Sequence, residues 1–492
     1  MSSQDARPAS GHIVIAFLSF VALGLRAGLL GVAWPSMRDT FSVSLDAVGV
    51  LFIVSTLGYL LVSVQSGHII ARIGLGAFLV WGAAIAGVSY LGHALAPTWG
   101  FIVGLTLLAS VGTAIIDAGL NTYFAINQSA GMMNWLHACF GFGGMVSPLL
   151  MTGVLSRGLS WRWGFVPVGA AYVALIAGFA LTRTRWPRGE AISHTETAPA
   201  PTHARSRDTL ALPVVWLSLL LFVAFTGMEG TSGQWPYTLF TEGRGIAPTT
   251  AGLWVSIAWG ATTAGRIIFG FVVKYVAPHT LLRVCMAVVI ATAGLLWWNP
   301  SDAASFLALA GISFMLAPLF PINTATTAER VGAEHASNAI GFQMAAARIG
   351  LALAPGLAGV VAKAYGLESI GAFLLINAIS MFVLHEILVG RIGNSSQPNQ
   401  SKLRGETQMR EHTQLTVYGT RWCPDVRRAR RFLDQHQIEY AYVDIDADSE
   451  ARTYCDDVHD GCWIVPTIAF PDGTLLFDPS AGELAAKLGL EL

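Results

Sequence analysis

VGTAIIDAGLNTYF, residues 111–124, is an apolar stretch interrupted by a single carboxylate, that of Asp117. A charged side chain inside a membrane span costs enough free energy that it is normally retained for a function. On a helix, Thr113, Asp117 and Asn121 lie on one side at four-residue spacing, so we expect this polar face to look into a cavity. The alternative interpretation is a structural Asp117 that a neighbouring cation neutralises.

The composition is that of a polytopic membrane protein. Charged residues make up 12% of the chain, against a usual ~25%, and hydrophobic residues make up 53%. Apolar runs of ~20 residues recur along most of the chain, which a large soluble α/β enzyme would not need. The net charge of -1 provides no field for nucleic acid, so we expect no nucleic-acid partner.

The apolar runs form two sets of six, separated by a polar segment with several arginines. They lie near residues 12–35, 47–66, 76–95, 99–125, 134–157, 161–182, 210–230, 251–273, 280–298, 303–325, 337–364 and 369–390. The predicted domains are a first half at 12–182, a cytoplasmic linker at 183–209 and a second half at 210–391.

Lysines and arginines in the short loops predict the orientation. Arg72, Lys274, Arg330, Arg391 and the arginines of the central linker alternate onto one side, which should be cytoplasmic. Basic residues on the opposite side weaken this bias without reversing it. We therefore expect a multi-pass protein of the inner (plasma) membrane, monomeric, with its N-terminus and its C-terminal domain in the cytoplasm.

Three motifs resemble those of a known transporter family. The pattern G-x-I-x-A-R-x-G at Gly67 to Gly74 resembles the loop signature of the major facilitator superfamily. The stretches at 112–121, 132–143 and 265–283 resemble the fourth, fifth and eighth helices of its fucose permease branch. The resemblance implies an all-α fold of about twelve transmembrane helices in two halves, with a small-molecule substrate bound between the halves.

The same resemblance assigns a role to Asp117, because the branch carries a carboxylate implicated in proton coupling at that position. Two positions depart from the pattern, since Ala71 replaces the family's acidic residue and Gly31 stands where the branch has a second aspartate. The ligands for a sugar must therefore come from elsewhere in the chain.

Polar residues inside the apolar spans are the candidate ligands. Arg26 lies midway along the first span and must pair or face water, and we expect its partner to be Asp117. Glu229 is a second candidate for carrying a proton, or else a solvated residue at the outer mouth. Clustered glycines around Glu229 suggest a broken helix that lines a cavity.

The substrate-binding candidates share a polar or indole group inside a predicted span. They are Arg26, Asn121, Asn134, His137, Gln234, Trp235, Asn323, Gln343 and Arg348, with Trp254 and Trp259 as residues that can stack on a sugar. We interpret His137 as a buried hydrogen-bonding group, because no second metal ligand accompanies it. No metal and no bound cofactor are expected in the transporter.

The last part of the chain has a different pattern. Residues 392–413 are polar and predict a flexible linker, and residues 414–492 predict a small α/β domain. Strands are expected at 415–418, 439–443, after 467 and at 474–477, with helices at 423–437 and 480–488.

This domain carries T-x-W-C-x-x-x-R-R at 420–428, I-V-P-T at 464–467 and F-P-D-G from 470. These motifs resemble glutaredoxins, particularly mycoredoxins, and imply a thioredoxin-like fold. The resemblance implies that Cys423 is the nucleophile, that Pro466 forms a cis bond beside it and that glutathione or mycothiol is the partner thiol. Val426 replaces the second cysteine of the family, which leaves a monothiol route or no redox role. Cys462 is a candidate resolving cysteine.

These features predict a secondary active transporter of a small polar, sugar-like solute, coupled to protons, with a tail that is a candidate thiol oxidoreductase. The transporter core itself is not expected to be an enzyme. The alternatives are a membrane-anchored thiol oxidoreductase, a transporter of an organic acid or drug-like compound, and a non-transporting receptor. Intramembrane charges favour transport, because an anchor needs none.

Overall fold

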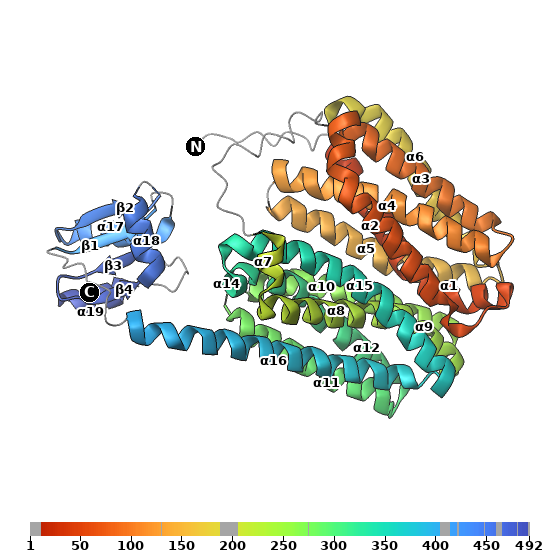
Figure 1. The fold of residues 1–492 in the computed structure, drawn as a ribbon. Coiled ribbons are helices and arrows are strands. Elements are labelled where there is room, and N and C mark those ends of the chain that lie inside the picture. Colours follow the sequence, from red (N-terminus) through yellow and green to blue (C-terminus); the bar gives the residue numbers. More distant parts are fainter. Residues whose placement is uncertain are drawn as a thin grey trace. The chain divides into compact units, whose positions relative to one another are not determined.

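The computed structural model describes residues 11–128, 130–186, 205–273, 275–403, 414–420, 423–446, 448–458, 465–479 and 481–490. The chain divides into two compact units, Met1–Ile392 and Gly393–Leu492 (Figure 1). In the described part of the first unit, twelve helical segments are long and apolar enough to cross a membrane. The predicted count of twelve spans is confirmed.

The first six spans are single helices that pack into one half. They are α1 (Gly11–Phe41), α2 (Val48–Ile73), α3 (Leu75–Leu95), α4 (Trp99–Asn127), α5 (Ala130–Leu155) and α6 (Arg162–Thr182). α1 packs along α5, and α3 packs between α4 and α6. Gly24 on α1 and Gly143 on α5 allow the first of these contacts, because a side chain on either would collide with the other helix's backbone.

The second half begins after a short helix, α7 (Ser206–Leu210), which belongs to the predicted central linker. Its elements are α8 (Pro213–Gln234), α9 (Pro236–Thr238), a π-helical turn (Leu239–Gly243), α10 (Pro248–Val272), α11 (Pro278–Trp298), α12 (Asp302–Leu316), α13 (Leu319–Ala325), α14 (Thr327–Val331), α15 (Ala333–Tyr365) and α16 (Ser369–Leu403). The predicted tenth span is two helices, α12 and α13, which meet at Pro318. Proline has no N–H to donate and clashes with the preceding turn, so the helix restarts there.

Two details of the predicted elements differ from the structure. α8 runs unbroken through the glycines around Glu229 and ends only at Gln234, before Pro236. The predicted break at the glycines is therefore wrong, because a helix tolerates glycine better than proline. α16 continues to Leu403, so it includes the first part of the segment at 392–413 that composition predicts as a linker.

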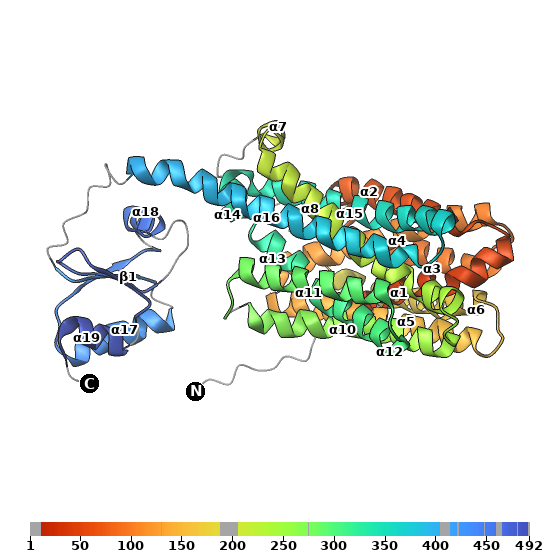
Figure 2. The same cartoon turned by 90° about the horizontal axis from the view of Figure 1, so that it is seen from below.

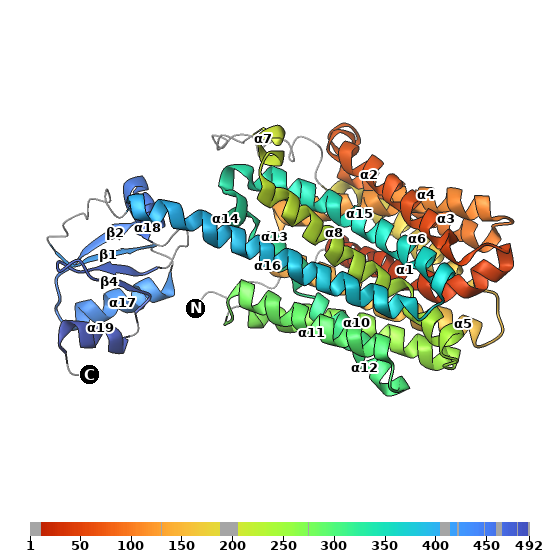
Figure 3. The ribbon, with the colours of Figure 1, turned by 60° about the horizontal axis from the view of Figure 1, so that its bottom comes forward.

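The two halves are visible as separate groups of helices, coloured red to yellow and green to cyan (Figure 1). Figure 3 shows the same division from another side, whereas the two halves overlap in the view of Figure 2. The halves meet where α5 packs against α10 and where α2 packs against α15, with smaller contacts from α1 to α8 and α9. Every site between the halves must lie along these seams.

The second unit contains a four-stranded sheet with the order β2-β1-β3-β4. β1 (Thr416–Gly419) pairs in parallel with β2 (Ala441–Asp444) and antiparallel with β3 (Thr467–Ala469), which pairs antiparallel with β4 (Leu475–Phe477). α17 (Pro424–Gln435) and α19 (Ala481–Leu488) cover one face, and α18 (Ser449–Val458) covers the other (Figure 2). The bond between Val465 and Pro466 is cis, as the glutaredoxin resemblance implies.

Candidate functional site

Asp117 lies on α4 with a side chain that is 24% exposed. Its Oδ2 accepts a hydrogen bond from the Tyr59 hydroxyl of α2 at 2.8 Å. Its Oδ1 accepts one from the Asn121 amide at 2.9 Å, so the predicted shared face of Asp117 and Asn121 is present. Thr113 is not part of this cluster, because its hydroxyl donates to the carbonyls of Ala109 and Ser110 in its own helix.

The cation beside Asp117 comes from the other half of the molecule. Arg348 of α15 places Nη2 3.5 Å from Asp117 Oδ2, and its side chain is 32% exposed. The guanidinium also lies over the ring of Tyr59, 3.5 Å from the ring centroid. One arginine thus binds a carboxylate of α4 and an aromatic ring of α2, which links the two halves inside their spans.

The expected pairing of Arg26 with Asp117 is wrong. Among the described residues, Arg26 makes no ion pair and no side-chain hydrogen bond, although it is half-buried on α1. The prediction considered only helices of one half, and Arg348 occupies the position beside the carboxylate instead. An arginine with no fixed partner must be solvated or must bind a ligand.

His137 is exposed rather than buried, which corrects the prediction for this residue. Its ring lies edge-on to Phe20, with centroids 5.4 Å apart, and among the described residues it makes no side-chain hydrogen bond. The side chain of Asn134, also on α5, lies outside the described residues.

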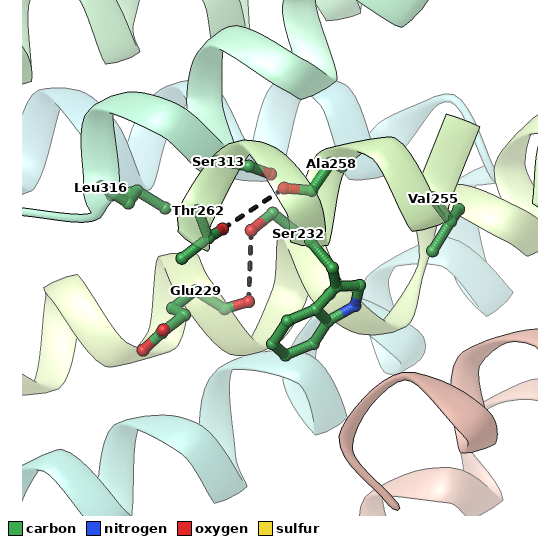
Figure 4. Close-up of a pocket in the computed structure, with 9 residues that line it drawn as sticks. Glu229, Ser232, Val255, Ala258, Thr262, Ser313 and Leu316 are labelled. Carbon is green, nitrogen blue, oxygen red and sulfur yellow. Dashed lines mark hydrogen bonds between the residues drawn. The ribbon is translucent and has the colours of Figure 1, made fainter. Parts of the chain in front are cut away.

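A second ion pair lies within the second half. Arg266 of α10 places Nη2 3.5 Å from Glu229 Oε1 of α8. A small pocket with room for about one water molecule opens beside this pair (Figure 4). Its lining comes from α8, α10 and α12, and comprises Glu229, Ser232, Gly233, Val255, Ala258, Trp259, Thr262, Ser313 and Leu316.

The pocket combines hydroxyl groups, a carboxylate and an indole. Ser232, Thr262 and Ser313 contribute the hydroxyls, and those of Ser232 and Thr262 donate to backbone carbonyls of their own helices. Trp259 contributes its indole to the lining, and its expected role in stacking on a sugar stays a prediction. Trp254 is instead packed between Phe240 and Phe306.

Four further candidates take part in packing of the second half. Trp235 is fully buried, and its indole N–H donates to the carbonyl of Pro355 at 2.9 Å. Gln234 is buried beneath it, with its backbone against Gly31 of the first half. Asn323 accepts from Arg330 at 3.1 Å, and Gln343 both accepts from Thr327 and donates to Ser218. The structure does not bring these four to Asp117.

One end of the two halves is closed by ion pairs and by direct backbone contact. Arg38 donates to both carboxylate oxygens of Glu242 at 3.1 Å, and Lys363 lies 3.0 Å from Asp46. Between them, a Cβ on Gly356 of α15 would lie 3.2 Å from the Cα of Gly49 on α2. Glycine at both positions favours this close approach, because a side chain at either would push the neighbouring backbone away.

In the tail, Cys423 precedes α17 at its N-cap and is 7% exposed. Its thiol lies 3.9 Å from the carbonyl of Val465, next to the cis Pro466. Val426 is buried, and its methyl groups occupy the space in front of Gly419. Cys423 is therefore positioned as the resemblance implies, and Cys462 lies outside the described residues.

Sequence reasoning missed several members of these clusters. Tyr59, Arg266, Ser232, Thr262 and Ser313 were not singled out, because tyrosine, serine and threonine in apolar spans are common and carry no periodic signal. Arg266 is the exception, since a lone arginine inside an apolar span is a signal in itself.

Comparison with known proteins gives matches for both units. The sequence model of the Major Facilitator Superfamily matches residues 15–336 and 217–428, and that of glutaredoxin matches residues 415–475. Bypass of stop codon protein 6 of Saccharomyces cerevisiae is 21% identical over 393 residues, which cover 73% of this chain and 78% of the relative. Mycoredoxin 1 of Corynebacterium glutamicum is 42% identical over 74 residues, 15% of this chain and 91% of the relative.

Solved structures match the helical unit. The nucleoside transporter NupG has a TM-score of 0.64 at 14% identity, over 76% of this chain and 98% of that one. The transporter FucP in its outward conformation has a TM-score of 0.53 at 14% identity, over 77% of this chain and 98% of that one. At this level of identity the likeness is one of fold.

Proposed function

Because the chain belongs to the Major Facilitator Superfamily and ends in a glutaredoxin domain, we propose that its helical unit couples the movement of a small polar solute to that of protons. The observation that carries this proposal is the contact of Asp117 with Arg348 and Tyr59, which joins the two halves inside the spans. FucP, one of the proteins similar in fold, is a fucose:proton symporter.

The coupling step follows from the charges at Asp117. When its carboxylate is ionised, it accepts hydrogen bonds from Tyr59 and Asn121 and attracts Arg348. Protonation removes the negative charge and turns one oxygen into a donor, so the attraction to Arg348 is lost while the cation stays. The link between α4 and α15 then weakens, and the halves are freer to move against each other.

The solute is a neutral, polyhydroxylated molecule such as a sugar or a nucleoside. The support is chemical: the residues around the pocket beside Glu229 are hydroxyls, a carboxylate and the indole of Trp259. In this conformation the pocket has room for about one water molecule, so it must widen to admit the solute. The arginines nearest the two carboxylates, Arg266 and Arg348, are already paired with them. An organic acid is the alternative, because Arg26 is a cation with no described partner to neutralise it.

Purified protein in liposomes tests the proposal. Accumulation and counterflow of labelled sugars, nucleosides and organic acids are measured with and without a proton gradient. Asp117→Asn should abolish accumulation against a gradient and retain counterflow. The reason is that the amide has the shape of the carboxyl group but cannot bind and release a proton. Asp302→Asn, at the exposed start of α12, is the matched control and should behave like the wild type. Accumulation by the Asp117→Asn variant would exclude this residue as the proton carrier.

For the tail we propose a monothiol redox function. In this proposal the protein is a monomer in the plasma membrane, and its tail lies in the cytoplasm. Cys423 would form a mixed disulfide with glutathione or mycothiol, and the support is its N-cap position beside the cis Pro466 together with the 42% identity to mycoredoxin 1. Mass spectrometry of protein incubated with each oxidised thiol tests this. The proposal would be rejected if the wild-type protein formed no adduct, or if Cys423→Ser formed as much adduct as the wild type.

A further inference from the structure

The outer face of α17 carries two arginines that the fold itself does not use. Arg427 and Arg431 are both exposed and, among the described residues, have no ion pair or hydrogen-bond partner. The other two arginines of the helix are engaged, since Arg428 contacts Asp425 and Asp478, and Arg430 binds Tyr440 and stacks on Tyr442.

These two arginines lie in line with the reactive sulfur. Cys423, Arg427 and Arg431 are four residues apart, so they follow one side of the helix from its N-terminus. At 1.5 Å per residue, the α-carbons of the two arginines lie roughly 6 and 12 Å along the helix axis from that of the cysteine. An extended peptide advances about 6.6 Å for every two residues, which is nearly the same spacing.

The rest of the tail has the opposite charge. Residues 414–492 contain fourteen acidic and seven basic side chains, and four of the seven basic ones are on α17. The acidic side chains of α17 are themselves in use, because Asp425 pairs with Arg428 and Asp434 accepts from the Tyr440 hydroxyl. We call the line of Cys423, Arg427 and Arg431 along α17 the basic track. It is a positively charged strip on a domain whose net charge is negative.

We propose that this track selects the disulfide partner of Cys423: a peptide segment whose cysteine is followed by acidic residues two and four positions later. The inference rests on the thiol reactivity proposed above for Cys423. The track suits such a segment because its two cations are exposed, have no ion-pair partner among the described residues, and are spaced like alternate residues of an extended chain. A basic segment would meet repulsion here, although it would be attracted by the net charge of the domain.

The reaction is a thiol–disulfide exchange. The thiolate of Cys423 attacks one sulfur of the partner's disulfide, a new S–S bond forms between them, and the second sulfur leaves as a thiolate. The proton that Cys423 gives up is matched by the proton that the leaving thiolate takes from water. Cys423 is oxidised and the leaving sulfur is reduced by the same electron pair, so no further reagent is required.

The test uses the full chain in detergent and three matched peptides, Gly-Cys-Gly-Xaa-Gly-Xaa, in which Xaa is Glu, Gln or Lys. Each cysteine is activated as a neutral 2-pyridyl disulfide, and release of 2-thiopyridone gives the rate constant after subtraction of the rate for Cys423→Ser. We expect the Glu peptide to react about tenfold faster than the Lys peptide, since each exposed ion pair contributes a modest factor. High salt should reduce that ratio.

The double variant Arg427→Gln/Arg431→Gln should bring the ratio to about one or reverse it, and should leave the rate with the uncharged 2,2′-dipyridyl disulfide unchanged. Arg452→Gln, an exposed arginine of α18, is the matched control and should keep the preference. Equal rates for the three peptides in the wild type, or faster reaction of the Lys peptide, would overturn the proposal. No reaction of Cys423 with dipyridyl disulfide would overturn the thiol function itself, and the proposed selectivity with it.

Discussion

Arg348 makes two contacts that require different properties of its side chain. The charge attracts Asp117, and the flat guanidinium stacks on Tyr59 at 3.5 Å from the ring centroid. Lysine has the same charge but a compact ammonium group that cannot cover an aromatic face in this way. The two functions can therefore be separated by one substitution.

We predict that Arg348→Lys retains solute binding and raises the rate of exchange, because a weaker link leaves the two halves freer to move against each other. Loss of the stacked contact removes roughly 1 to 2 kcal/mol, which corresponds to about a five- to thirtyfold change. Counterflow by purified protein measures it. Arg283→Lys, whose parent arginine pairs with Glu386 on the exposed surface, is the control and should change little. Unaltered exchange by Arg348→Lys would mean that the charge alone matters.

In the tail, the contacts of Asp472 with Lys487 at 2.7 Å and with Thr474 hold the pKa of this carboxyl well below its usual range. A lowered folded-state pKa stabilises the fold above the unfolded value of about 3.9, and that contribution is lost as the pH falls through the folded value. At neutral pH the contribution is fully present.

Asp472→Asn is therefore expected to loosen the hairpin of β3 and β4 at pH 7 and to make progressively less difference below about pH 4. Hydrogen exchange of residues 467–477 in the full chain measures the effect, after correction for the intrinsic pH dependence of exchange. A variant whose exchange differs from wild type by the same factor at every pH would show that the carboxylate's charge is not responsible.

At the scale of elements, the closed end of the halves depends more on backbone approach than on ion pairs. The pairs Arg38 with Glu242 and Lys363 with Asp46 are solvent-exposed, and such pairs contribute about 0.2 to 1 kcal/mol each. Side-chain atoms forced between close-packed helices cost about 1 to 3 kcal/mol. The contact of Gly49 with Gly356 is thus the more sensitive feature.

Gly356→Leu is predicted to hold this end open. Spin labels on cysteines at Leu95 and Tyr365, both 82% exposed, report the separation of the halves by pulsed electron paramagnetic resonance. We expect a shift towards longer distances in the variant. Gly341→Leu, on the same helix but with open space around it, should leave the distribution unchanged. Identical distributions for the two variants would contradict the prediction.

The elements themselves were largely predictable, because a run of ~20 apolar residues has few structural alternatives. The exceptions have local causes. Pro318 divides the tenth span into α12 and α13, and α18 was missed because its residues 449–458 are mostly polar and lack a strong apolar period. Boundaries of α1 and α16 extend past the apolar runs, since hydrophobicity indicates a membrane span and not the end of a helix.

The site was only partly predictable. Asn121 follows from Asp117 by helical spacing, but Arg348 is joined to Asp117 only through the packing of two halves. Spacing along the sequence carries no information on such a contact. Tyr59 was missed because it reaches Asp117 only through the packing of α2 on α4 within the first half. The choice of Arg26 was wrong because it assumed a partner from the same half.

For the whole molecule, an even number of spans places both ends of the helical unit on one side of the membrane. The basic loops predict that this side is the cytoplasm. We expect that a cysteine at Gln400 is not labelled by an impermeant thiol reagent in intact cells and is labelled after the membrane is permeabilised. A cysteine at Tyr365, the last residue of α15, should react in intact cells. The reverse pattern would place the tail outside.

The position of Arg348 in the chain also has a consequence for biosynthesis. Asp117 and Arg348 are 231 residues apart, so a ribosome inserts the carboxylate into the bilayer long before the arginine that pairs with it exists. During that interval the first half carries an intramembrane acid with only Tyr59 and Asn121 as partners. Until α15 is inserted, Asp117 lacks its cationic partner. We therefore expect a chain truncated before α15 to be recognised by membrane quality control and degraded. Supplying residues 210–403 as a separate polypeptide should rescue it.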